Sequence, residues 1–161
     1  MDKTMDAHAL HDLVAGMHMS YYETGGPDRQ IDMMLCAVVR GRVGFVELEA
    51  GSHDEWYAKA AHVLRGLDAE LYCVASEAWL ATAKPVGDPV NRLTPSQRSD
   101  RMEVVATVAA DRQGNVASSV KMIERHAEGE RIGAVRSLTD CDGFDGAEGR
   151  MFSIFEMAGL A

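Results

Sequence analysis

Residues Ile31 to Glu49 read IDMMLCAVVRGRVGFVELE, and this stretch decides the fold class. Two apolar, β-branched runs flank a tight turn, which predicts strands over Ile31–Arg40 and Val43–Glu49 joined at Arg40-Gly41-Arg42. The first run is apolar at nearly every position, so it is expected inside a sheet. The second alternates apolar and acidic residues toward its end, as a half-buried strand does.

Two amphipathic helices lie on either side of this hairpin in the sequence. The first is predicted over Met5–Tyr22, where apolar residues recur at intervals of three and four. The second begins at the capping box Ser52-His53-Asp54-Glu55, in which Ser52 and Glu55 satisfy each other's backbone amides. Gly66 is placed to end that helix.

The remainder of the chain predicts strands separated by short turns, apart from one long loop at Thr82–Ser99. The predicted strands are Glu70–Ala81, Arg101–Ala110, Val116–His126, Arg131–Leu138 and Met151–Met157. The order is therefore α-β-β-α-β-β-β-β-β in one domain, residues 1–161. We expect an α+β fold with a mainly antiparallel sheet of six to seven strands and both helices packed on one face.

Composition narrows the class of protein. The 161 residues are 47% hydrophobic and 25% charged, which is typical of a folded globular chain. No apolar run approaches the ~18 residues of a membrane span, and no secretion signal is evident. Cys36, Cys73 and Cys141 are widely spaced, which argues against a disulfide framework and favours a cytoplasmic location. The net charge of −9 disfavours non-specific nucleic-acid binding.

The first predicted helix carries a candidate metal site. His8, His11 and Asp12 occupy one helical turn, where imidazole and carboxylate groups could converge on a zinc-like ion. His18 joins them on the face opposite the predicted apolar stripe of Leu10, Val14 and Met17. The alternatives are a solvated polar face or a partner-binding face. No cofactor is otherwise predicted.

An acidic, glycine-rich segment near the C-terminus is a second candidate for a divalent metal. Asp140, Asp142 and Asp145 alternate with glycines, as in loops that wrap calcium. The register departs from the EF-hand, because Asp145 stands at the sixth position, where that loop has glycine. An acidic surface loop is the alternative.

Two strand carboxylates are candidates for acid–base catalysis. Glu77 lies beside Trp79 on one predicted strand, and Glu103 begins the next. A carboxylate in an apolar setting can have a raised pKa and act as a general acid or base. The alternative is that both glutamates form ordinary ion pairs across the sheet.

A candidate binding site lies where the long loop enters the following strand. Arg92, Arg98 and Arg101 gather there near Trp79, and arginine forks match phosphate or carboxylate groups. The alternative is a junction held by arginine–carboxylate pairs.

Three short motifs are similar to those of another group of proteins. SEAW at Ser76–Trp79, PSQRSDRMEVV at Pro95–Val105 and IER at Ile123–Arg125 together resemble small proteins encoded by phages and prophage-bearing bacteria. The resemblance covers about a third of the chain. It implies a viral or mobile-element context but no reaction, so no catalytic residue is carried over.

Two hypotheses of function follow. The first is a non-catalytic, acidic binding or accessory protein that acts on a host protein, for example in counter-defence. The second is a small metal-dependent or acid–base hydrolase that uses Glu77 and Glu103, or the cluster of His8, His11 and Asp12. A homodimer fits either hypothesis, because the apolar C-terminal segment Met151–Ala161 is predicted to pair at an exposed sheet edge.

Overall fold

The computed structural model describes residues 4–24, 33–81, 84–94, 97–128, 131–140 and 150–160. Its helices and strands follow the order α-β-β-α-β-β-β-β-α, with short 3₁₀ turns before β4 and before the last helix. They are α1 (Ala7–Thr24), β1 (Met34–Val39), β2 (Arg42–Val46), α2 (His53–Leu67), β3 (Leu71–Leu80), η1 (Pro89–Arg92), β4 (Met102–Asp111), β5 (Val116–Glu128), β6 (Arg131–Asp140), η3 (Arg150–Phe152) and α3 (Ile154–Met157).

The strands form one sheet in the order β2-β1-β3-β4-β5-β6, and every neighbouring pair is antiparallel. The α+β class and the antiparallel sheet are thus confirmed. The turn between β1 and β2 consists of Arg40 and Gly41, and both have positive φ, at 51° and 72°. Two such residues are what a tight hairpin of type I′ requires, so the predicted turn is also confirmed.

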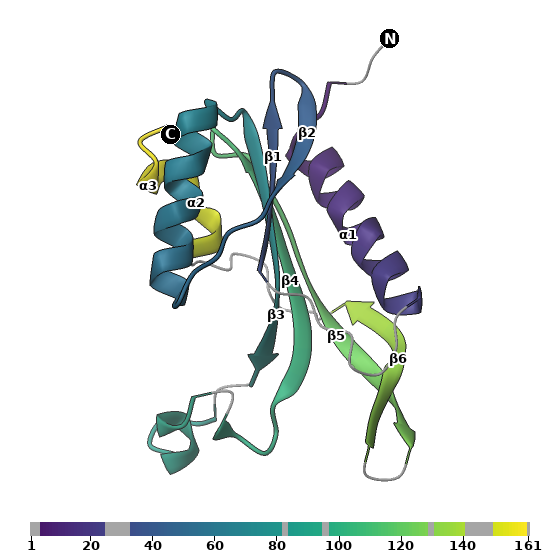
Figure 1. Ribbon diagram of the computed structural model, residues 1–161. Coiled ribbons are helices and arrows are strands. Elements are labelled where there is room, and N and C mark those ends of the chain that lie inside the picture. The colour runs from purple at the N-terminus through teal and green to yellow at the C-terminus, as the bar shows by residue number, and fades with distance from the viewer. Residues whose placement is uncertain are drawn as a thin grey trace.

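The helices cover both faces of the sheet, which corrects the prediction that they share one (Figure 1). α1 packs across β3, β4, β5 and β6 on one face, whereas α2 lies over β1 on the other and contacts α3. The physical reason lies in the central strands. Successive residues of β1 and β3 point to opposite faces, and both sets are apolar and buried, so each face needs a cover.

Two buried clusters result, one on each face. The α2 cluster contains Leu35, Ala37, Tyr72, Val74 and Leu64, and the α1 cluster contains Cys36, Val38, Cys73, Leu10 and Val14. Ala110 and its neighbour Ala109 separate in the same way, with one in each cluster. The sheet therefore separates two apolar layers and contributes side chains to both.

The predicted seventh strand, Met151–Met157, is wrong. The segment forms η3 and the short helix α3, and it buries Ile154, Phe155 and Ala158 against the α2 cluster. Buried residues at positions i, i+1 and i+4 lie on one side of a helical turn, whereas a strand would alternate. The predicted pairing of this segment at a sheet edge is wrong for the same reason, because the segment is not a strand. A homodimer itself stays a prediction.

The start of α2 confirms Ser52 as the predicted cap, but the Glu55 carboxylate bonds the Gly51 amide and not the predicted Ser52 amide. The Ser52 hydroxyl accepts a hydrogen bond from the Glu55 amide at 3.1 Å, while the Glu55 carboxylate accepts one from the Gly51 amide at 2.8 Å. The Gly51 hydrogen bond, together with Lys59, lowers the pKa of Glu55. The predicted end at Gly66 is wrong by two residues, because Asp68 adopts the left-handed conformation there, with φ of 54°.

The apolar stripe of α1 is rotated from its predicted position. Ala7, Leu10, Val14 and His18 are the buried residues, whereas Met17 is 42% exposed. Buried positions spaced by three and four residues define the side that faces the sheet. The prediction that His18 lies opposite this side is therefore wrong.

Candidate functional site

The ends of β3 and β4 extend past α1 and α2, and the connection that carries η1 lies beyond them (Figure 1). Trp79 lies near the end of β3 and is 42% exposed. The Arg101 guanidinium stacks over its ring at 4.3 Å from the ring centroid. An exposed cation–π contact of this kind is worth about 0.5–1 kcal/mol, enough to orient both side chains.

The two candidate catalytic carboxylates lie on the α1 face of the sheet near this end. Glu77 is directly opposite Val105, and Trp79 is directly opposite Glu103. Glu77 and Glu103 are thus diagonal neighbours on adjacent strands, and both side chains are half-buried. The structure brings together the pair that the sequence singled out, while its role in acid–base catalysis stays a prediction.

The three arginines of the predicted anion clamp have different surroundings, and a joint role in binding an anion stays a prediction. Arg98 is buried and donates two hydrogen bonds to Asp100, at 2.9 and 2.6 Å. Those bonds from Arg98 hold the pKa of Asp100 below its usual range, so Asp100 remains an anion that neutralises Arg98. Arg101 stacks on Trp79, and Arg92 ends η1 with an exposed side chain.

The connection between β3 and β4 is held by side-chain bonds to its backbone. Asn91 accepts a hydrogen bond from the Lys84 amide at 2.9 Å and donates to the carbonyls of Lys84 and Pro85 at 3.0 and 3.1 Å. Asp88 accepts from the Val90 amide at 2.9 Å and so starts η1. These bonds fix the segment locally without an apolar core.

This fixed segment presents apolar side chains to solvent. Val86 is fully exposed and Leu93 is 44% exposed. We name the set of Trp79, Arg101, Val86 and Leu93 the distal patch. Sequence reasoning missed Val86 and Leu93, although Asp88 before Pro89 is a signal for an ordered turn.

The histidines of α1 have three different environments. His8 is exposed, while His18 is 4% exposed and neither of its ring nitrogens has a hydrogen-bond partner among the residues that the structure describes. Burial lowers the pKa of His18 to about 4. His11 lies between them in exposure, and its Nε2 is 2.7 Å from the Ser119 hydroxyl on β5.

His11 also approaches Asp12, with its Nδ1 at 3.1 Å from the carboxylate. Asp12, His11 and Ser119 therefore form a chain of hydrogen bonds that links α1 to the sheet. Within the ranges given above, no three histidine, cysteine or acidic side chains come together as metal ligands do. The metal site at His8, His11 and Asp12 has no support from this arrangement and stays a prediction. The calcium candidate lies outside the described residues at Asp142 and Asp145, and Asp140 ends β6.

The buried thiols of Cys36 and Cys73 face each other across β1 and β3. Both are free, as the sequence predicted for core residues. Burial raises the pKa of Cys36 to about 11 and also raises the pKa of Cys73. Both are therefore thiols at neutral pH and poor nucleophiles.

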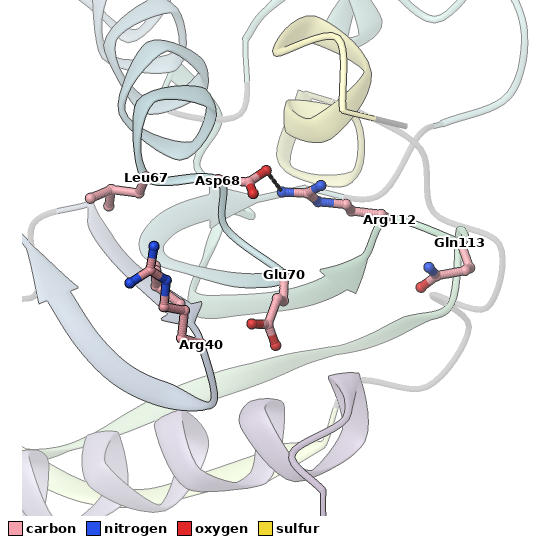
Figure 2. Close-up of a pocket in the computed structure, with 7 residues that line it drawn as sticks. Arg40, Leu67, Asp68, Glu70, Arg112 and Gln113 are labelled. Carbon is pink, nitrogen blue, oxygen red and sulfur yellow. Dashed lines mark hydrogen bonds and ion pairs between the residues drawn. The ribbon is translucent and has the colours of Figure 1, made fainter.

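At the other end of the sheet, a hollow of about 390 Å³ lies between the end of α2, the β1–β2 turn and the β4–β5 turn. Figure 2 shows Asp68 and Arg112 joined on one side of it and Arg40 on another. Arg112 bonds Asp68 at 2.6 Å and the Ala69 carbonyl at 2.7 Å. Its guanidinium is thus engaged in holding the end of α2 to the β4–β5 turn.

Comparisons of the chain with protein-family models, with curated proteins and with solved structures found no match. None of the helices in the described part of the chain combines the length and apolar character needed to cross a bilayer.

Proposed function

We propose that this chain is a non-catalytic binding protein that contacts a protein partner through the distal patch. The observation that carries the proposal is the exposed Arg101–Trp79 stack, and the connection that follows Trp79 in the chain adds exposed Val86 and Leu93. Tryptophan and arginine are the residues most enriched among those that dominate binding energies at protein interfaces. Exposed apolar side chains on an ordered segment lose little conformational entropy when they are covered.

The charge of the chain favours a particular kind of partner. A net charge of −9 repels nucleic acid and steers association toward a basic protein surface. The resemblance to phage-encoded proteins supports a host protein as that partner, with counter-defence as one such role.

Trp79→Ala is expected to weaken partner binding by roughly 30-fold or more, as loss of a central interface residue does. The matched control is Val116→Ala, because Val116 is 38% exposed and begins β5, at the opposite end of the sheet from Trp79. Immobilised wild-type and variant chains would be compared for the proteins they retain from host lysate, with affinities then measured on the purified partner. The proposal fails if both variants retain the same partners equally.

A hydrolase is the second candidate, and one observation favours it. In the chain Asp12–His11–Ser119, the carboxylate lies at Nδ1 and the hydroxyl at Nε2, as in a Ser-His-Asp triad. However, Ser119 lies in the middle of β5, on the face of the sheet that α1 covers. Asp12 is largely exposed. We therefore interpret this chain as a contact that fixes α1 to the sheet.

A fluorophosphonate probe distinguishes the two candidates, because it labels a serine only when a neighbouring base activates its hydroxyl. We expect no labelling of the wild-type chain at Ser119. Labelling that is lost in both Ser119→Ala and His11→Gln would instead favour the hydrolase.

A further inference from the structure

The hollow of about 390 Å³ between the end of α2, the β1–β2 turn and the β4–β5 turn has walls that hydrogen bonds hold in place. Arg112 fixes the end of α2, as described above. The Asp111 carboxylate accepts bonds from two backbone amides of the β4–β5 turn, at 2.9 and 2.8 Å. The Glu70 amide donates to the Val38 carbonyl at 2.8 Å, next to the β1–β2 turn. A ligand that enters the hollow therefore has little backbone to order, so little binding energy is lost to conformational entropy.

Arg40 lines this hollow from a backbone position where arginine is unfavourable. It is the first residue of the β1–β2 turn, with φ of 51°, and glycine, asparagine or aspartate usually stands there. Other side chains are strained at positive φ, because their Cβ approaches the backbone. Strained residues of this kind concentrate where a side chain has a functional role. The turn itself gains nothing from arginine, so the guanidinium is the part of Arg40 that a function would use.

The charges that line the hollow are balanced. The lining contains two guanidinium groups, those of Arg40 and Arg112, and two carboxylates, those of Asp68 and Glu70. Figure 2 shows that Asp68 bonds Arg112, whereas Arg40 and Glu70 bond none of the other side chains drawn. A purely anionic ligand is repelled by Glu70, and a purely cationic ligand is repelled by Arg40. A ligand that carries both charges can pair with both groups, which favours a zwitterion.

We propose that this hollow binds a free α-amino acid with an apolar side chain. The ligand carboxylate accepts hydrogen bonds from Arg40, and its ammonium group donates to Glu70. Val39 and Leu67 add apolar lining, and Leu67 is 43% exposed, so an aliphatic side chain covers apolar surface there. A volume of about 390 Å³ lies toward the lower end of small-molecule sites, which suits a ligand of this size. The hollow is at the opposite end of the sheet from the distal patch, so the two proposals stand separately.

Calorimetric titration with leucine and two of its analogues tests the charge requirement. Isocaproate is leucine without the ammonium group, and isoamylamine is leucine without the carboxylate. Each analogue loses one charge-assisted hydrogen bond, so each should bind roughly tenfold or more weakly than leucine. Absence of heat at millimolar leucine, or equal affinity for leucine and either analogue, would overturn the proposal.

Two variants locate the site. Arg40→Asn and Glu70→Gln should each weaken leucine binding by roughly tenfold or more. Asparagine suits the first position of a type I′ turn, so Arg40→Asn should melt at or above the wild-type temperature, and its weaker binding then reports the missing guanidinium rather than misfolding. Arg42→Gln is the matched control, because Arg42 is exposed on the same hairpin but lies outside this hollow. Wild-type affinity in either hollow variant, or an equal loss in Arg42→Gln, would refute the site.

Discussion

Replacing Phe155 with alanine should lower the free energy of unfolding by about 3–5 kcal/mol, the usual cost of removing a buried phenylalanine ring. Phe155 is 3% exposed and packs edge-to-face on Tyr72, with ring centroids 4.8 Å apart and an interplanar angle of 80°. Tyr72 is fully buried and donates a hydrogen bond from its hydroxyl to the Met151 carbonyl at 2.7 Å. The change would therefore leave a cavity where the C-terminal segment meets the sheet.

Urea denaturation followed by circular dichroism measures this loss. Met157→Ala is the matched control, because Met157 lies on the same short helix but is 48% exposed. An exposed substitution of that kind is expected to change stability by about 0.5 kcal/mol or less. Similar losses for the two variants would show that α3 does not complete the α2 cluster.

The second large effect is expected for His18→Leu. This substitution should raise the free energy of unfolding, and the gain over the wild type should increase as the pH falls. Both ring nitrogens of His18 are buried without a partner in the described part of the chain. Replacing such a group with an apolar side chain of similar size removes a desolvation cost of about 1–3 kcal/mol at neutral pH. Burial also lowers the pKa of His18 from 6.5 to about 4.

The lowered pKa fixes the direction of the pH dependence. Between these two pKa values the unfolded chain binds a proton at His18 and the folded chain does not, so stability falls as the pH is lowered through this window. The loss from this residue is about 1.4 kcal/mol per pH unit. The advantage of His18→Leu over the wild type should therefore grow by roughly 2 kcal/mol between pH 7 and pH 5.

Urea titrations of both chains at several pH values check this expectation. His8→Leu serves as the control, because His8 is exposed on the same helix and its variant should follow the wild type. If the stabilities of His18→Leu and the wild type remain parallel across the window, His18 is not buried as a neutral group.

The sequence predicted the parts of the fold that depend on local chemistry. The turn at Arg40 and Gly41 and the cap at Ser52 each arise from neighbouring residues, so both were identifiable. The placement of both helices on one face was predicted wrongly, although the doubly apolar β1 already implied cover on both faces.

Two errors arose because local patterns were ambiguous. On α1, the buried residues Ala7, Leu10 and Val14 place His18 near the middle of the apolar side and Met17 toward its edge, so a polar residue is buried where an apolar one was expected. The run at 151–157 is too short for periodicity to separate a strand from a helix. The candidate site at the end of β3 and the start of β4 stays a prediction, and the stack of Arg101 on Trp79 is a tertiary contact that spacing in the sequence cannot reveal.

The hydrogen bond between Tyr72 and Met151 joins residues 79 positions apart. During synthesis it can form only after Met151 has been added to the chain. A ribosome that adds about 5–20 residues per second needs roughly 4–16 s to travel from one to the other. Throughout that interval the nascent chain has β1 and β3 but lacks the residues that seal their α2 side. Tyr72 lacks its contacts with Phe155 and Met151 until the end of synthesis, so we expect this part of the α2 cluster to be the last to close.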